Sequence, residues 1–343
     1  MTGHGPTGGA TRDASRPSPI VSSVPFDEDG AHHGHLRLPY SRDDSAWGSV
    51  MIPIAVIGNG DGPTALFTGA NHGDEYEGPV ALQELALALD PARVSGRVIV
   101  LPALNAPAFR AGTRTSPIDG GNLNRSFPGR PDGTITEKIA DYVARTLVPL
   151  ADLVLDFHSG GRTLEFLPFA ACHRLPDPAQ DAACAAAMRA FGAPFSVRMV
   201  EIDAVGMYDT EVESRGKAFV TTELGGGGTA SARTIDIARR GARNLLVHAG
   251  ILDGELETTA GVELEMPDGC FTFSDRDGLI EPLVDLGGPV EAGRPVARVW
   301  PVDRTGEAPR ELIAGADGML LGRHFPGLVK GGDCAAVVGR ALR

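Results

Sequence analysis

Residues 71–75 of the chain read Asn-His-Gly-Asp-Glu, so that His72 and Glu75 form a His-x-x-Glu pattern. The pattern lies between a β-rich run and a helical run. An imidazole and a carboxylate three residues apart on a tight strand-to-helix turn can converge on one ion, and zinc binds both at about 2.0 to 2.2 Å. Taken alone, the pattern more often marks an inert, solvated pair.

A third metal-binding side chain is predicted at His158, which ends the apolar run 152–158 and precedes two glycines. In isolation, His158 is also explained as a core histidine bonded to the backbone. Together with His72 and Glu75 it completes a set of two histidines and one carboxylate, which leaves a fourth position for water, as catalytic zinc sites require. Alternate strand residues share a face, so Asp156 either orients His158 or serves as an ordinary capping or solvent-facing aspartate.

Glu223 closes another apolar run, 218–224, and four glycines follow this run. Glycines allow a loop to approach a ligand closely or to move. A carboxylate near a zinc-bound water can accept its proton and later deliver it to a departing amine. We therefore predict Glu223 as the general base, against the alternative of a strand-end glutamate that faces solvent.

Arg114 and Arg125 lie in the loop 113–129, which is rich in turn residues. A guanidinium group matches the geometry of a carboxylate and can stabilise a developing oxyanion. These arginines are thus candidates for anion recognition, although surface salt bridges are the default role of any arginine.

The elements that must position these residues alternate between strands and helices from about residue 49 to 250, which indicates a sheet with crossover helices. Strands are predicted at 49–57, 64–69, 97–104, 152–158, 198–202 and 218–224. Helices are predicted at 78–89, at 134–148 with a capping box at its start, at 178–191, and at 229–252 with a break at Gly241. In such folds ligands gather where strands end.

The pattern changes after residue 254, where short strands are punctuated by Gly and Pro and helical periodicity disappears. The segments 278–293 and 318–332 form a faint repeat with a period near forty, which predicts two similar β-hairpin units packed face to face. This arrangement resembles the barrel-sandwich fold of biotinyl and lipoyl carrier domains. The junction 300–306 lacks the lysine that carriers use, so a lid or assembly role is the better interpretation.

Length and composition limit the remaining possibilities. The 343 residues include 31 Lys and Arg against 44 Asp and Glu, a net charge of −13 that disfavours nucleic acid and anionic membranes as partners. The four cysteines form no C-x-x-C pair, which favours a reducing cytoplasm over a disulfide framework. The sequence predicts neither a signal peptide nor a membrane-spanning helix. We expect a disordered tail at 1–20, a catalytic domain at 21–253 and a β domain at 254–343.

The motifs in this order, with Asn-Leu-Asn-Arg-Ser-Phe-Pro-Gly at 122–129 between the two histidine motifs, resemble the succinylglutamate desuccinylase and aspartoacylase family. The resemblance covers roughly residues 45–250 and extends to the small β domain. It implies an α/β fold of the zinc-carboxypeptidase type, with a mixed sheet of about eight strands flanked by helices and a smaller C-terminal all-β domain. The stretches 72–79, 119–122 and 221–228 most resemble the branch of the family that removes an acetyl group from a diamino acid.

The resemblance also implies roles for individual residues. His72, Glu75 and His158 match the ligands of one zinc ion per subunit, and Glu223 matches the catalytic glutamate. Asn124 and Arg125 match the pair that holds a substrate carboxylate. Arg114 corresponds to the arginine that polarises the carbonyl, although its distance in sequence from Arg125 is longer than in aspartoacylase.

The implied activity is a zinc-dependent hydrolysis of a linear amide, with an N-acylated amino acid as the small-molecule partner. The residues that bind the second carboxylate of the aspartoacylase substrate could not be placed in this sequence, which agrees with a substrate that carries an amine there. The alternatives are another acyl-amino-acid hydrolase or a zinc carboxypeptidase of the same fold and, more distantly, a carrier module without catalysis. The sequence leaves a homo-oligomer open.

Overall fold

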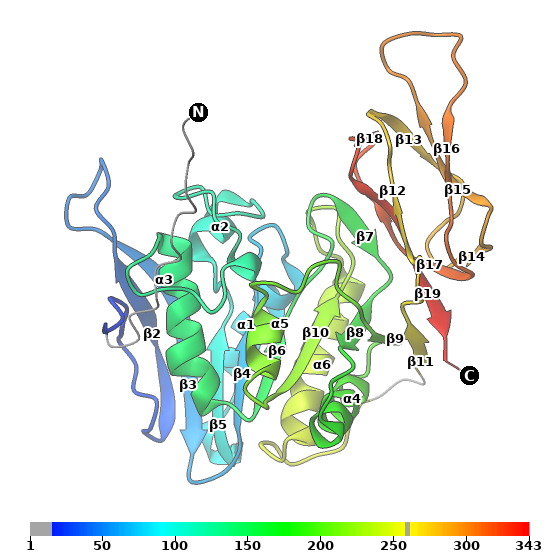
Figure 1. The fold of residues 1–343 in the computed structure, drawn as a ribbon. Coiled ribbons are helices and arrows are strands. Elements are labelled where there is room, and N and C mark those ends of the chain that lie inside the picture. The colour runs from blue at the N-terminus through cyan, green and yellow to red at the C-terminus, as the bar shows by residue number, and fades with distance from the viewer. Residues whose placement is uncertain (1–15, 258–260, 343) are drawn as a thin grey trace, which may run out of the picture.

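The computed structural model describes residues 16–257 and 261–342. Most of the predicted tail, residues 1–15, therefore lies outside the described residues. The fold class is confirmed: a large mixed sheet is flanked by helices, and an all-β region follows at the C-terminal end (Figure 1). No helix among the described residues is both long and apolar enough to cross a membrane.

Among the described residues, the part of the main sheet that precedes residue 254 contains nine strands on its main path. In spatial order they are β1 (Val21–Ser22), β2 (Gly30–Pro39), β3 (Ser49–Asn59), β5 (Gly96–Leu101), β4 (Thr64–Thr68), β6 (Leu153–Asp156), β10 (Ala218–Glu223), β8 (Phe169–Cys172) and β9 (Phe195–Arg198). The central strands β5, β4, β6 and β10 run parallel. Their carboxyl ends therefore meet at one edge of the sheet, where the predicted site residues follow β4, β6 and β10.

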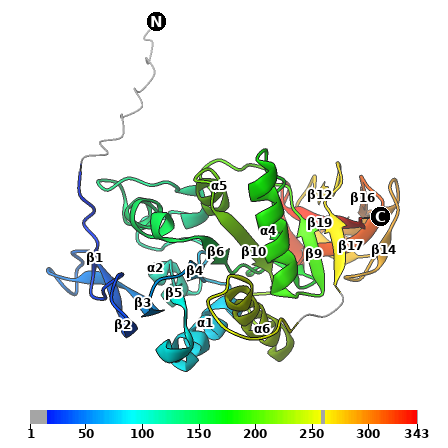
Figure 2. The ribbon, with the colours of Figure 1, turned by 90° about the horizontal axis from the view of Figure 1, so that it is seen from below.

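Helices cover both faces of this sheet. The helices are α1 (Glu77–Ala88), α2 (Ala106–Ala111), α3 (Ile135–Tyr142), α4 (Pro178–Phe191), α5 (Tyr208–Glu213) and α6 (Ala232–His248). Seen from below, α1, α6 and α4 lie along one side of the sheet, where α6 packs against both neighbours (Figure 2). Residues of α3 and α5 belong to the core on the opposite face.

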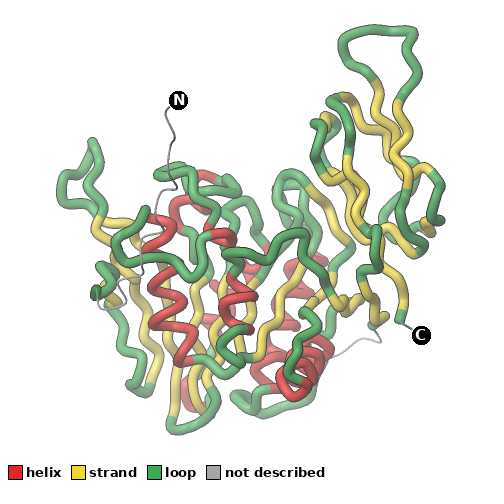
Figure 3. Tube along the Cα trace, in the orientation of Figure 1, coloured by secondary structure: helices red, strands yellow, loops and turns green. Residues whose placement is uncertain are grey.

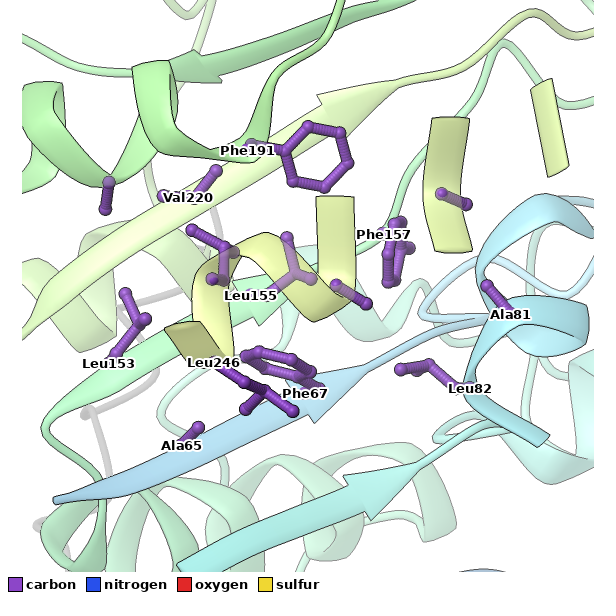
Figure 4. Close-up of a cluster of buried hydrophobic side chains, with 14 of the residues drawn as sticks. Ala65, Phe67, Ala81, Leu82, Leu153, Leu155, Phe157, Phe191, Val220 and Leu246 are labelled. Carbon is purple, nitrogen blue, oxygen red and sulfur yellow. The ribbon is translucent and has the colours of Figure 1, made fainter. Parts of the chain in front are cut away.

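The alternation of side chains along each strand explains why two cores form. On β4, Phe67 packs toward α1 and α6, whereas Leu66 belongs to the core beside α3. On β6, Leu155 and Val154 divide in the same way. Figure 4 shows Phe67 and Leu155 among the side chains of the first core. Burial on both faces fixes the register of these strands and hence the position of the residues that follow them.

Three of the predicted elements differ from the structure. The strand predicted at 198–202 is instead β9 (Phe195–Arg198), because the parallel pairing with β8 ends at Arg198. The helix predicted at 134–148 is α-helical only to Tyr142 and continues as a π turn, Val143–Leu147. Gly241 does not interrupt α6, because it is the point where the ring of Phe191 packs on the helix, leaving a Cβ no room.

In the C-terminal region, the residues 261–342 that the structure describes form strands and no helix (Figure 3). These are β11 (Val262–Glu265), β12 (Phe271–Phe273), β13 (Gly278–Pro282), β14 (Pro289–Val290), β15 (Pro295–Trp300), β16 (Arg310–Ile313), β17 (Gly318–His324), β18 (Leu328–Val329) and β19 (Cys334–Ala341). The main sheet continues into this region, because β11 pairs with β9 and with β19. Strand β7 (Leu164–Phe166), from the catalytic part, pairs with β17.

The predicted repeat is visible in the pairing of these strands. The first repeat begins with β13 and continues into β14, and the second begins with β17 and continues into β18. The strands are exchanged between the repeats, since β14 pairs with β17 and β18 pairs with β13. Each repeat therefore completes the sheet of the other rather than forming a closed hairpin of its own.

Candidate active site

The turn between β4 and α1 carries the first two predicted metal ligands. Ala70 has φ 51°, a left-handed conformation that is unusual for a residue other than glycine. Gly73 lies so close to the backbone of Ala108 that an added Cβ would be 2.0 Å from its carbonyl carbon. This tight path places His72 and Glu75 on the same side of the turn, where both side chains are buried.

The structure brings His72, Glu75 and His158 together, with their ligand atoms within 4.8 Å of one another. Oε1 of Glu75 lies 2.8 Å from Nδ1 of His72, and Oε2 of Glu75 lies 2.9 Å from Nδ1 of His158. The backbone N of Ser159 donates to Oε2 as well. Two imidazole nitrogens and one carboxylate therefore converge on one point from two different strand ends.

Asp156 contacts His158 as the alternation of strand residues predicted. Its Oδ2 lies 2.8 Å from Nε2 of His158 and accepts a hydrogen bond from Asn71. Its Oδ1 accepts a hydrogen bond from the hydroxyl of Thr68. Because a fully buried carboxylate accepts a hydrogen bond from Nε2–H, the lone pair of His158 is on Nδ1, which faces Glu75.

The ionisation of Glu75, His72 and His158 is typical of a site that binds a cation. Burial alone would raise the pKa of Glu75, but His72 and His158 outweigh it and hold that pKa far below its ordinary value. Burial lowers the pKa of His72. For His158, Glu75 and Asp156 outweigh the effect of burial and raise the pKa well above its ordinary value. Two buried carboxylates thus contact the same imidazole, and a divalent ion held by the two Nδ1 atoms and Glu75 would add positive charge beside them. The donor set fits zinc.

We expect Asp156→Asn to weaken metal binding about 10- to 100-fold, because an amide has one acceptor oxygen and no charge, so it cannot accept hydrogen bonds both from Thr68 and from His158. The zinc dissociation constant, measured by competition with a chelator, checks this. Thermal unfolding of the metal-free variant serves as the control for a loss of fold. Unchanged zinc affinity would show that Asp156 does not orient His158.

Glu223 lies at the end of β10 and faces the same cavity as the metal group. Its Oε2 is buried and has no hydrogen-bond partner among the described residues. Burial and the nearby Glu75 carboxylate raise the pKa of Glu223 to about 8. A carboxyl group whose pKa is close to 7 can accept a proton and return it at neutral pH.

The glycines after Glu223 allow a close approach to the segment that follows β6. Gly226 has φ 146°, and a Cβ at this position would be 2.0 Å from the carbonyl oxygen of Leu164. The carbonyl of Gly225 accepts hydrogen bonds from Gly160 and Phe166. These bonds join the loop after β10 to the loop after β6, so Glu223 and His158 are held relative to each other.

The two arginines and Asn124 line the same cavity as the metal group. Nη1 of Arg114 lies 3.3 Å from Nδ1 of His72 and 3.7 Å from Oε1 of Glu75, and the side chain is 46% exposed. Oδ1 of Asn124 accepts a hydrogen bond from the backbone N of Tyr208, which leaves its amide NH₂ as a donor. Arg125 donates to the carbonyl of Asn124, and no carboxylate of the described chain lies within ion-pair distance of it.

The cavity, of about 190 Å³, also has walls that the sequence analysis did not predict. Met266, Phe271 and Val337 of the C-terminal region form an apolar side, which explains how that region contributes to the site. Glu201 and Asp209 form an acidic side. Glu201 fell within the strand predicted at 198–202, whereas β9 ends at Arg198. No sequence motif included Asp209. In the sequence, only their position after a strand end could have indicated them.

Comparisons with known proteins agree with this geometry. Residues 61–249 match the family model described as succinylglutamate desuccinylase/aspartoacylase catalytic domain. The chain is 53% identical to the N-alpha-acetyl-L-2,4-diaminobutyric acid deacetylase of Halomonas elongata, over 95% of this chain and 96% of that protein.

Solved structures are similar over nearly the whole chain. The product-bound structure of the ectoine utilization protein EutE (DoeB) from Ruegeria pomeroyi has a TM-score of 0.93 and 64% identity, covering 95% of this chain and 99% of that one. A succinylglutamate desuccinylase from Silicibacter sp. TM1040 has a TM-score of 0.92 and 63% identity, covering 95% of this chain and 100% of that one.

Proposed function

The chain belongs to the succinylglutamate desuccinylase/aspartoacylase family of amide-hydrolysing enzymes, and from this premise we propose that it is a zinc-dependent deacetylase of N-alpha-acetyl-L-2,4-diaminobutyrate. The products are acetate and L-2,4-diaminobutyrate, as in ectoine degradation. The observation that carries the proposal is one cavity lined by the His72, Glu75 and His158 group, by Arg125 and by Glu223, whose buried Oε2 has no hydrogen-bond partner among the described residues. The identity to the Halomonas elongata deacetylase supports the choice of substrate.

In this proposal His72, Glu75 and His158 hold the zinc. When bound, zinc would lower the pKa of water and polarise the acetyl carbonyl. Glu223 accepts the proton of the attacking water and returns it to the amide nitrogen as the C–N bond breaks.

The remaining residues position the substrate. Arg114 donates to the carbonyl oxygen as negative charge develops on it, a type of contact whose removal costs about 2.7 to 4 kcal/mol. Arg125 and the amide of Asn124 hold the substrate carboxylate. The apolar wall formed by the C-terminal region keeps bulk water away from the reacting groups.

A substrate panel tests the proposal. We expect hydrolysis of acetyl-diaminobutyrate to exceed that of acetylaspartate, succinylglutamate and short peptides in kcat/KM. Preference for succinylglutamate or acetylaspartate would assign the chain to another activity of the family, and preference for peptides would indicate a carboxypeptidase. No hydrolysis of any of them by the zinc-loaded protein would contradict the proposed function.

Arg125→Ala should weaken substrate binding, because the substrate carboxylate loses a charge-assisted hydrogen bond. Such a bond contributes about 1.5 to 3 kcal/mol, so KM should rise roughly 10- to 150-fold while kcat changes less. Steady-state kinetics of the variant check this result, with Arg130→Ala as a control just after the same loop, since Arg130 does not line the cavity. Unchanged KM and kcat would remove Arg125 from the binding site.

The other assignments stay predictions. These are one zinc per subunit, a cytoplasmic location and the domain limits 21–253 and 254–343. Metal analysis of the purified protein and expression of residues 21–253 alone would test the first and the last.

A further inference from the structure

The acidic side of the catalytic cavity has no role in the hydrolysis described above. It is formed by the segment 199–209, which contributes Glu201 and Asp209 to the lining. Asp209 is 4% exposed, and the side chain of Glu201 is 18% exposed. Their carboxylate oxygens lie within 4.8 Å of each other and of a ring nitrogen of His173. Two acidic groups in a small cavity indicate that its occupant carries positive charge there.

His173 neutralises only part of the negative charge at this end, because it also pairs with Glu213. Its Nδ1 lies 3.0 Å from Oε2 of Glu213, and its Nε2 lies 3.6 Å from Oε1 of Glu201. Glu201 and Glu213 outweigh the effect of burial and raise the pKa of His173 to about 10. One imidazolium among three carboxylates, those of Glu201, Asp209 and Glu213, leaves an excess of negative charge at this end of the cavity.

Asp209 retains one carboxylate oxygen for a ligand. Its Oδ1 accepts hydrogen bonds from the backbone N and the hydroxyl of Thr210. In the part of the chain that the structure describes, no donor is bonded to Oδ2. Burial raises the pKa of Asp209 to about 6, so the group remains a carboxylate at neutral pH. A buried carboxylate with a free oxygen suits an occupant that brings its own N–H donors.

Asp209 lies in a segment that is hydrogen-bonded to the segment predicted to bind the substrate carboxylate. The backbone N of its neighbour Tyr208 donates to Oδ1 of Asn124 at 3.0 Å. The backbone N of Phe127 donates to the carbonyl of Gly206 at 2.9 Å, which joins the two segments a second time. The cavity therefore presents the cation of Arg125 and the anion of Asp209 from adjoining segments. A short amino acid with a carboxylate at one end and an ammonium group at the other matches this pair.

We propose that Asp209, assisted by Glu201, binds the side-chain ammonium group of the substrate and so selects acylated diamino acids. The inference rests on the proposed function, because it concerns the same cavity. The same carboxylates repel a substrate that carries a second carboxylate at this place, so they act against acetylaspartate as well as for the amine.

Asp209→Asn tests the proposal with two substrates, N-alpha-acetyl-L-2,4-diaminobutyrate and N-acetyl-L-2-aminobutyrate, which lacks the amine. The measured quantity is the ratio of their kcat/KM values. Removing one partner of a buried charge pair costs at least about 2 kcal/mol, so the ratio should fall at least about 30-fold. Asparagine keeps Oδ1 for Thr210, which limits damage to the fold.

Glu211→Gln is the matched control, because Glu211 is a carboxylate on the same helix that pairs with Arg215 and does not line the catalytic cavity. We expect it to leave the ratio unchanged. If Asp209→Asn lowers kcat/KM equally for both substrates, the role of Asp209 is structural and the proposal is wrong. A second equivalent of zinc in the unmodified protein that disappears in Asp209→Asn would also overturn it, since a metal ion would then occupy the cluster.

Product binding to the unmodified, zinc-loaded protein separates this inference from the proposed function and needs no variant. Calorimetry should show L-2,4-diaminobutyrate binding at least about 30-fold more tightly than L-2-aminobutyrate. Equal affinities would overturn the ammonium subsite even if the protein hydrolyses the acetylated substrate. Tight and selective binding without hydrolysis would instead contradict the deacetylase activity and retain the subsite.

Discussion

Glu223→Gln should lower kcat about 10²- to 10⁴-fold while the protein still binds its metal. Gln has nearly the same shape as Glu but cannot accept the proton of the attacking water or return it to the leaving nitrogen, and general acid–base catalysis contributes a factor of this size. Glu223 is not among the three residues whose ligand atoms converge, so zinc content should be unchanged. Stopped or continuous assay of acetate release, together with metal analysis of the same sample, measures both quantities.

Glu84→Gln is a suitable control for this variant. Glu84 is an exposed glutamate on α1 that pairs with Arg239, outside the catalytic cavity. We expect its kcat to stay near that of the unmodified enzyme. If Glu223→Gln kept a near-normal kcat, the assignment of Glu223 as the general base would be wrong.

Removal of the metal should lower hydrolysis more than about 100-fold, and one equivalent of zinc should restore it. Without the ion, the attacking water is not activated and the acetyl carbonyl is not polarised, effects worth several kcal/mol. The metal-free protein should also unfold at a lower temperature, because an ion that binds only the folded state stabilises that state. Activity and thermal unfolding, followed before and after exhaustive dialysis against a chelator, measure these effects.

A variant of the metal group separates metal loss from general damage by the chelator. Glu75→Gln should stay inactive when zinc is returned, because Glu75 contacts both histidines. His33→Gln, at an exposed position on β2, should recover like the unmodified protein. Full activity after complete removal of metal would refute the zinc-dependent mechanism.

The interpretation of the sequence was most successful where the relevant signals are local. The strand β10 (Ala218–Glu223) and the helix α4 (Pro178–Phe191) were predicted nearly to the residue, because apolar runs and capping residues act within a few positions. The turn with His72 and Glu75 was also recognisable, because its two side chains are three residues apart. The family followed from the order of such motifs and is confirmed by the comparisons.

Errors arose where an element depends on distant partners. The strand β9 was predicted too late in the chain, at 198–202, because its ends are set by pairing with β8 and β11 rather than by its own residues. Gly241 was interpreted as a break in α6, although it is required by the packing of Phe191. Propensity describes a residue in its own segment, and packing against another segment can override it.

The sequence by itself determined which side chains could bind a metal and carry a proton, since these are properties of residue type and local spacing. Only the tertiary structure decided that Glu75 and His158, 83 residues apart, are within hydrogen-bond distance. It likewise decided that Asp209 and residues of the C-terminal strands close the same cavity. The physical reason is that parallel strands bring their carboxyl ends to one edge of the sheet whatever their separation along the chain, and that separation carries no signal in a single sequence.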